Sequence, residues 1–190
     1  QFESDERFKV MVGSTEGETI LSTNNKKPPF DNVKMRKALA HAINRQEIID
    51  GAMFGYGTPI GTHFAPHNPN YLDLTSKSNY DPELSMKLMK EARYDGSLEI
   101  SLKLPPPSYA RRGGEIVASQ LRKVGFNVKI SNLEWAQWLE QVFKGKDYNL
   151  TIVSHTEPAD INIYARSDYY FQYDSPKFQK LMSKLNLSSE

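Results

Sequence analysis

The chain has 190 residues, of which 38% are hydrophobic and 25% charged, a length and composition typical of one globular domain or one large lobe. Its formal net charge of +1 at pH 7 gives no bulk electrostatic basis for binding nucleic acid or an anionic membrane. The absence of cysteine excludes disulfide bonds, thiol catalysis and cysteine-based metal sites.

The first half of the chain predicts two short strands and then two consecutive helices. The apolar runs Phe8–Val12 and Thr19–Thr23 are the expected strands. Asp31 is the expected N-cap of the first helix, because its carboxylate can accept from the free N–H groups of the first turn. Asn44 restarts the pattern as a second cap, with Glu47 placed as in a capping box. The first helix carries an apolar stripe at helical spacing, made of Met35, Ala38, Leu39, Ala42 and Ile43.

The segment 56–80 is predicted to be a long ordered loop, because it is rich in proline and glycine and has no helical stripe. His63 and His67 lie four residues apart in this loop. Prolines interrupt the segment, so helical metal-ligand geometry is not expected, and we expect these histidines to bond backbone groups. The sequence therefore predicts no metal site and no cofactor.

Helices and strands alternate from Asp81 onward, where Asp81 and Pro82 are the expected N-cap and first residue of a helix. The later elements are a strand at Leu98–Leu104, a helix ending at Val124, a strand at Phe126–Ile130, a helix at Trp135–Phe143, a strand at Leu150–Val153 and a helix at Ser175–Leu187. The inward face of the last helix is expected to be Phe178, Leu181, Met182 and Leu185. This order predicts an α/β fold with a mixed or mostly parallel sheet flanked by helices.

Enzyme signatures are absent from the sequence. It contains no G-x-S-x-G elbow, no phosphate-binding loop and no H-E-x-x-H motif. We therefore expect that the chain is not an enzyme. One enzymatic alternative remains, a hydrolase or transferase that would use Asp160 and Glu157 as paired carboxylates.

Arg111 and Arg112 stand near the start of the helix that ends at Val124. Either this helix begins at about Gly114, or it includes both Gly113 and Gly114 at a local cost of roughly 1 kcal/mol each. Arginine beside the exposed N–H groups of a helix start forms a natural carboxylate site. The alternative is that both arginines lie at a solvated loop end.

The segment Ser154–Tyr173 follows a predicted strand directly, where ligands gather in α/β sheets. It combines the carboxylates of Glu157 and Asp160 with aromatic residues that include Tyr164, a mixture suited to a cationic amine. The alternatives are that its aromatics form part of the core, or that Tyr169–Tyr173 forms an exposed patch for a protein partner.

Two runs carry a family resemblance. The first is P-P-F-D followed by R-x-A-L-x-x-A-I-x-R, and the second is I-I-D-G followed by G-Y-G-T-P. The chain resembles the family 5 extracellular solute-binding proteins of bacterial ABC importers, of the dipeptide, oligopeptide and nickel types. The helix from Tyr80 also follows the family pattern, except that Arg93 replaces the family's glycine.

The resemblance implies that residues 1–190 form one lobe, the second of a longer two-lobed, monomeric protein of the periplasmic-binding-protein type. The expected partners are a peptide ligand, the missing N-terminal lobe and the membrane permease subunits. The expected location is the periplasm, or the cell surface by a membrane tether, with a signal sequence upstream of the fragment. Lobe closure on a di- or oligopeptide would deliver it for import.

The resemblance also assigns roles at the site. Arg111 or Arg112 would hold a peptide carboxylate, and Asp160, with Glu157 second, would pair with its amine. His155 stands where the family often has tryptophan, and Tyr164 lies nearby in the same segment. The cargo could instead be a nickel chelate, haem or an oligosaccharide, and a chelate would need His63, His67 or His155 to face the cleft.

Overall fold

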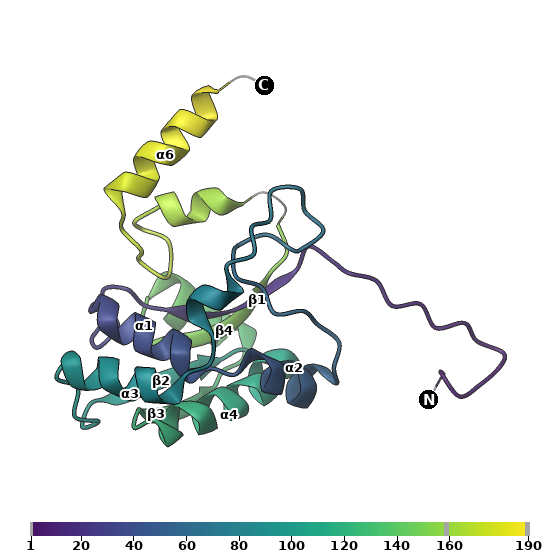
Figure 1. The fold of residues 1–190 in the computed structure, drawn as a ribbon, viewed down its shortest axis with the longest axis horizontal. Coiled ribbons are helices and arrows are strands. Elements are labelled where there is room, and N and C mark those ends of the chain that lie inside the picture. Colours follow the sequence, from purple (N-terminus) through teal and green to yellow (C-terminus); the bar gives the residue numbers. More distant parts are fainter. Residues whose placement is uncertain (1, 158–159, 189–190) are drawn as a thin grey trace.

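A computed structural model describes residues 2–157 and 160–188, and these residues form a four-stranded mixed sheet in the order β1-β4-β2-β3 (Figure 1). Strand β1 (Glu18–Thr23) runs antiparallel to β4 (Leu150–His155). Strand β2 (Glu99–Leu104) runs parallel to both β4 and β3 (Asn127–Asn132). The predicted mixed α/β sheet is therefore confirmed.

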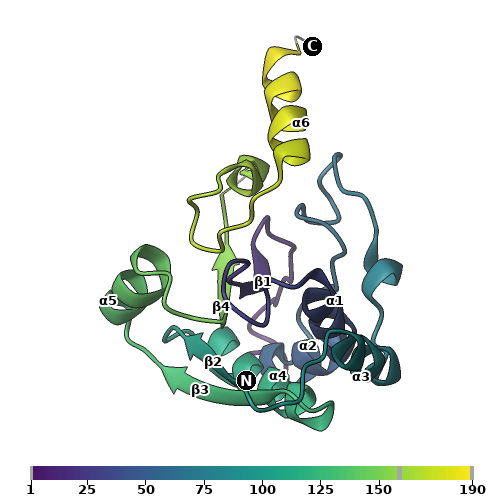
Figure 2. The same cartoon turned by 90° about the vertical axis from the view of Figure 1, so that its left-hand side faces the viewer.

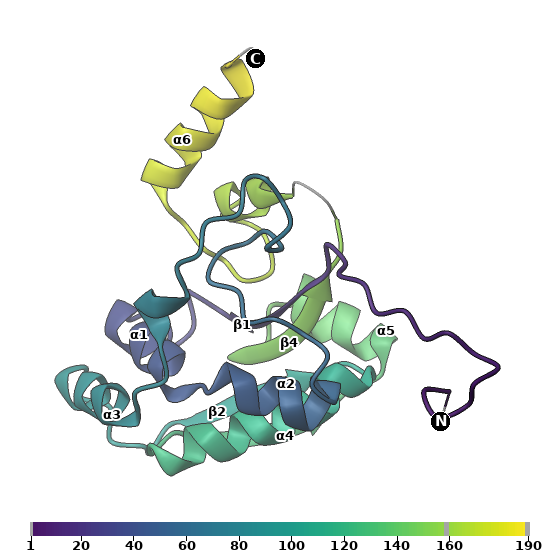
Figure 3. The same cartoon turned by 45° about the vertical axis from the view of Figure 1, so that its right-hand side comes forward.

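Helices cover both faces of this sheet. One side carries α1 (Val33–Ala42), α2 (Arg45–Met53), α3 (Pro82–Glu91) and α4 (Ser108–Lys123). Helix α5 (Trp135–Trp138), continued by a π-helical turn at Leu139–Lys144, lies on the other side (Figure 2). Helix α2 packs along α4, and α1 packs on α3 (Figure 3).

Strand β4 separates two apolar clusters because its side chains alternate between the faces. Leu150 and Ile152 belong to the large core beneath α1–α4, whereas Val153 belongs to a second cluster with Trp138 and Tyr170. A strand buried on both faces favours a continuous apolar run. The run LTIV at the start of β4 meets this requirement except at Thr151, whose buried hydroxyl donates a hydrogen bond to a backbone carbonyl of β2.

Side-chain caps set the helix starts. Asn44 accepts from the N–H groups of Gln46 and Glu47, and Asp81 accepts from that of Leu84, as predicted. The prediction for the first helix was wrong by one residue, because Asn32, and not Asp31, accepts from the N–H of Lys34.

Helix α4 includes both glycines in its interior, which decides between the two alternatives for its start. It begins at Ser108, directly after Pro107. A Cβ atom on Gly114 would lie 2.3 Å from Leu104 Cδ1, so the glycine lets α4 approach β2 closely. A Cβ on Gly113 would meet Ile48 Cγ2 at 3.6 Å, an ordinary contact with α2.

Two predictions near the ends of the chain were wrong. Phe8–Val12 forms no strand; it extends away from the body (Figure 1), and its backbone has no sheet partner in the part of the chain that the structure describes. Helix α6 (Pro176–Leu187) projects from the body, and of its expected inward residues only Met182 is buried. Leu181 and Leu185 are 53% and 58% exposed because no other element covers that face within the described residues.

The segment between α2 and α3 contains only a short 3-10 helix, Thr75–Ser78. Its two halves lie against each other, since Thr62 donates a hydrogen bond to the carbonyl of Leu72. Arg45 fixes its far end by donating to the carbonyl and hydroxyl of Ser78, both at 2.7 Å. The long loop is therefore held to the helical layer at its far end, and His63 in its first half reaches Glu18 of β1. Among the described residues, none of the helices has the length and apolar character of a membrane span.

We expect Gly114→Ala to destabilise the fold by about 1–3 kcal/mol, because the added methyl overlaps Leu104 of β2. Gly113→Ala is the matched control, since its methyl fits beside Ile48 and the gain in helix propensity should leave stability unchanged or up to about 1 kcal/mol higher. Urea unfolding measures both. Equal effects of the two substitutions would contradict the close approach of α4 to β2.

Arg93 lies just after α3 with φ of +58°, a left-handed conformation that a side chain disfavours. Arg93→Gly should therefore raise the free energy of unfolding by roughly 1 kcal/mol. Arg93→Ala keeps the Cβ atom and should give no comparable gain. A stabilisation of the same size in both variants would mean that the guanidinium, and not the backbone angle, is responsible.

Candidate functional site

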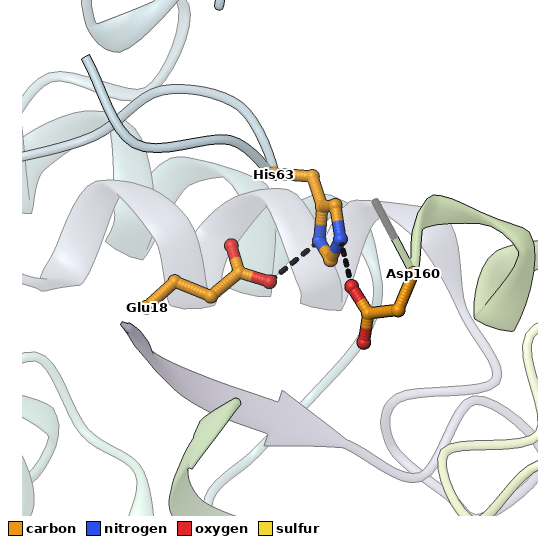
Figure 4. Close-up of side chains that lie close together, drawn as sticks. All are labelled: Glu18, His63 and Asp160. Atoms are coloured by element: carbon orange, nitrogen blue, oxygen red, sulfur yellow. Dashed lines mark hydrogen bonds and ion pairs between the residues drawn. The ribbon is translucent and has the colours of Figure 1, made fainter. Parts of the chain in front are cut away.

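Three segments distant in sequence meet at one end of the sheet. Glu18 at the start of β1 lies opposite His155 at the end of β4 in the strand register. Asp160 lies at the start of the 3-10 helix Ile161–Ala165. The long loop brings His63 between Glu18 and Asp160 (Figure 4).

The imidazole of His63 contacts both carboxylates. Its Nε2 forms a 2.6 Å hydrogen bond with Asp160 Oδ1, and its Nδ1 lies 2.6 Å from Glu18 Oε1. The second contact has ion-pair distance but lacks regular hydrogen-bond geometry. The side chains of His63, Glu18 and Asp160 are 7%, 5% and 16% exposed, so these charges are largely withdrawn from water.

The protonated form of His63 is favoured in this position. Burial acts to lower the pKa of His63, but the neighbouring carboxylates of Glu18 and Asp160 outweigh it and hold the pKa above its ordinary value of 6.5. Two carboxylates around one imidazolium leave an excess of negative charge. The cluster can therefore attract a further cation.

Tyr164 and His155 border the cluster. The ring of Tyr164 meets that of His63 edge-on, with centroids 5.2 Å apart. Burial, and then the charges of Glu18 and Asp160, raise the pKa of the Tyr164 phenol, which stays neutral. His155 Nδ1 lies 3.8 Å from Asp160 Oδ2, while its Nε2 makes a 3.1 Å hydrogen bond with the hydroxyl of Tyr170.

An apolar groove of about 500 Å³ begins at Tyr164 and runs along β1. Its lining includes Ile20, Leu21, Phe171, Tyr173 and Phe178. The groove lies beside the charged cluster because Tyr164 borders both. The aromatic groove and the negatively charged cluster therefore meet at Tyr164.

Glu157 is exposed and lies beside Asp160 and His155; one oxygen of each carboxylate and a ring nitrogen of His155 all lie within 4.8 Å of one another. Its carboxylate accepts a hydrogen bond from the N–H of Thr156. That bond lowers the pKa of Glu157 below its ordinary range, so the group is anionic. Of the predicted site residues, four therefore gather at one place: Asp160, Glu157, His155 and Tyr164.

The two arginines lie apart from this cluster, in the first turns of α4. Arg111 pairs with Glu134 at 3.0 Å, and the Arg112 guanidinium lies 5.1 Å from the ring centroid of Phe54. The hydroxyl of Tyr109, near the start of α4, accepts a 3.1 Å hydrogen bond from the N–H of Ser154. The start of α4 and the end of β4 therefore share one end of the sheet.

Sequence reasoning missed Glu18 and assigned His63 wrongly. His63 bonds carboxylates and not backbone, and His67 pairs with the carboxylate of Glu16. The one available signal was an acidic residue directly before a predicted strand, at a position that strand alternation can turn inward. Nothing local in the sequence connects residues 18, 63 and 160. The alternative that the aromatics belong to the core holds for Tyr170 and Phe171, which are buried.

We expect His63→Gln to lower the free energy of unfolding by on the order of 3 kcal/mol at pH 6, because it leaves two buried carboxylates without a cation. The pKa of His63 is raised on folding, so its stabilisation is complete below about pH 6.5 and is lost as the pH rises through the folded-state value. Urea unfolding across this range should show the deficit shrinking as the pH rises. His67→Gln is the control, with an expected loss under about 1 kcal/mol because that pair is exposed.

Comparison with known proteins gives a consistent result. The profile described as "Bacterial extracellular solute-binding proteins, family 5 Middle" matches residues 1–175. The dipeptide-binding protein of Escherichia coli is 34% identical over 131 residues, covering 66% of this chain and 24% of that protein. Heme-binding protein A of Haemophilus influenzae is 26% identical over 151 residues, covering 77% and 28%. The chain thus spans about a quarter of the length of these relatives.

Solved structures show the same fold. The oligopeptide-binding protein AppA of Bacillus subtilis, in complex with a nonapeptide, superposes with a TM-score of 0.85 at 22% identity, over 99% of this chain and 42% of that chain. The dipeptide-binding protein of Pseudoalteromonas sp. SM9913, in complex with Met-Leu, gives 0.87 at 23% identity, over 100% and 40%. NikA of Staphylococcus aureus, in complex with Ni(L-His)2, gives 0.84 at 19% identity, over 100% and 42%. The chain belongs to the family 5 bacterial extracellular solute-binding proteins.

Proposed function

We propose that this chain is the ligand-binding lobe of a two-lobed protein that captures di- or oligopeptides for a bacterial ABC importer. The observation that carries the proposal is the negatively charged cluster around Asp160 beside an aromatic groove. Family membership supports the class, because its relatives include proteins named for dipeptide binding and structures in complex with peptides.

The amino end of the peptide binds at Asp160. One of its carboxylate oxygens, Oδ1, bonds His63, whereas Oδ2 faces His155 at a distance too long for a hydrogen bond. An ammonium group at Oδ2 would restore the charge balance of the cluster. The Tyr164 ring and the groove beyond it would receive the first side chains.

The carboxyl end binds at the start of α4, where Arg111 and Arg112 lie. Arg111 now pairs with Glu134, whose side chain is 74% exposed, and such surface pairs contribute little to stability. A ligand carboxylate can therefore replace Glu134 at small cost. Arg111 Nε is buried and has no hydrogen-bond partner among the described residues, which leaves a donor for that carboxylate.

In this proposal the protein captures its ligand by lobe closure and catalyses no reaction. A second lobe would close over the peptide, and the closed form would dock on the membrane permease. The ligand shifts the open–closed equilibrium by its differential affinity for the closed state. The protein acts outside the cytoplasmic membrane and releases its cargo unaltered.

The test uses native mass spectrometry and calorimetry on the complete protein with a defined peptide. We expect an adduct of unaltered peptide mass, and a loss of roughly tenfold or more in affinity for Asp160→Asn, since a charge-assisted bond contributes about 1.5–3 kcal/mol. Asp168→Asn is the matched control, because the Asp168 side chain is 80% exposed and its 3.9 Å ion pair with Arg166 lies at the surface.

N-acetylation of the peptide isolates the amine. Acetylated peptide should bind the wild type about as weakly as free peptide binds Asp160→Asn, and Asp160→Asn should not weaken it further. A further loss of affinity when acetylated peptide is tested on Asp160→Asn would mean that the peptide amine binds at another place. A chelate, haem or sugar adduct would keep the import role and overturn the peptide cargo. A cleaved product would favour an enzyme, and no adduct with any of these would favour an interaction domain.

A further inference from the structure

Asp160 already has a cationic partner where the proposed cargo would place a second one. His63 Nε2 bonds Oδ1 of Asp160 at 2.6 Å, and the cargo amine would bind Oδ2 of the same carboxylate. We propose that the amine and the proton on His63 Nε2 compete for Asp160, so that capture of the amine releases this proton and becomes tighter as the pH rises. The inference rests on the proposed function and names a regulation of its site.

Only a protonated imidazole suits both carboxylates of the ligand-free site. His63 lies between Glu18 and Asp160, with one ring nitrogen 2.6 Å from an oxygen of each (Figure 4). A neutral imidazole has one N–H group and one bare nitrogen, and a bare nitrogen facing a carboxylate oxygen at this distance is repelled by it. Burial acts to lower the pKa of His63, but the two carboxylates outweigh it and hold the pKa above 6.5.

The other groups around His63 leave it as the main positive charge of the cluster. The ring of Tyr164 meets the imidazole edge-on, and burial raises the pKa of its phenol, which stays neutral. Glu157 adds a further carboxylate next to Asp160. Among the described residues, no lysine or arginine forms an ion pair with Glu18 or Asp160.

His155 is the second imidazole near Asp160, and its contact is weaker. Its Nδ1 lies 3.8 Å from Asp160 Oδ2, beyond hydrogen-bond distance, and its Nε2 bonds the hydroxyl of Tyr170 at 3.1 Å. His155 therefore leaves Oδ2 open to an amine, whereas His63 already donates to Oδ1.

An ammonium group at Oδ2 would change the charge balance at His63. It would lie roughly 5 Å from the imidazolium, since each cation contacts one oxygen of the same carboxylate. At this distance in a largely buried site, the repulsion between two positive charges weakens proton binding by on the order of 10- to 100-fold. The proton leaves Nε2 and not Nδ1, because Glu18 is the more buried carboxylate and has no other cationic partner among the described residues.

One cation replaces another in this step. The proton passes from His63 Nε2 to water, the ammonium takes its place at Asp160, and no covalent bond of the cargo changes. The bare Nε2 can then accept a hydrogen bond from one of the three N–H groups of the ammonium. At low pH the amine must displace the proton, whereas at higher pH more molecules already carry a neutral His63, so binding is tighter. A peptide amine itself stays protonated up to about pH 7.7, where this gain ends.

The experiment is calorimetric titration of the complete protein with Met-Leu, the dipeptide in complex with the Pseudoalteromonas relative. Two buffers of different ionisation enthalpy give the number of protons released as well as the affinity. We expect roughly tenfold tighter binding at about pH 7 than at about pH 5.5, with release of up to one proton per peptide. N-acetyl-Met-Leu carries no ammonium group and should release no proton. The wild type supplies these results, so they do not depend on the folding of a variant.

Variants assign the proton to one imidazole. His63→Gln should lose the pH dependence, with less than about a twofold change in affinity over the same range. His155→Gln should keep the tenfold ratio, whatever its affinity, because His155 is not the group that titrates. His67→Gln is the matched control on the same loop, since His67 pairs with Glu16 at the surface, and it should behave as the wild type does. Circular dichroism shows whether each variant is folded.

The outcomes separate this inference from the proposed function. Equal affinity for Met-Leu at both pH values without proton release would overturn the competition and leave peptide capture intact. Loss of the pH dependence in His155→Gln but not in His63→Gln would also overturn it. An NMR titration of the ligand-free protein that gives His63 a pKa at or below 6.5 would do so without any ligand. Absence of Met-Leu binding at both pH values would overturn the peptide cargo and this inference together.

Discussion

A buried negative charge needs a positive partner, and this requirement determines how the candidate site is assembled. Glu18 and Asp160 lie on segments far apart in the sequence, and the imidazole of His63 lies between their carboxylates. Without that imidazole, burial of both carboxylates would cost several kcal/mol. The long loop is thus held over the end of the sheet by the ion pairs of His63 in its first half and by the hydrogen bonds of Arg45 at its far end.

The sheet makes this meeting possible because β4 is covered on both faces. Its side chains alternate between two apolar clusters, one on each face of the sheet, and this packing fixes the register of the strand. That register places His155 opposite Glu18 at the end of the strand pair. Helix α6 projects from the body of the lobe, and its side chains Leu181 and Leu185 are exposed. In our proposal, the second lobe would cover this face of α6.

Much of the fold was predictable because its signals are local. Asn44 and Asp81 cap helices through their own side chains, and the alternation in β2 buries Ile100, Leu102 and Leu104. Four residues of the site were predictable as well, because the segment that carries Asp160, Glu157, His155 and Tyr164 follows a predicted strand of an α/β sheet. The predictions were wrong or left open where the local structure depends on a contact with a segment distant in the sequence. Phe8–Val12 has strand composition but no sheet partner among the described residues. The start of α4, which the sequence left open between two alternatives, depends on the close fit of Gly114 against Leu104.

The sequence by itself determined the family, the α/β class, most element positions and the segment that carries Asp160. It did so because capping, hydrophobic periodicity and turn residues act over a few positions. Only the tertiary structure decided that Glu18, His63 and Asp160 meet, since ion pairs between segments this far apart in the sequence depend on the path of a loop. It also separated Arg111 and Arg112 from that cluster, because strand order and helix packing, not sequence spacing, set the distance between them.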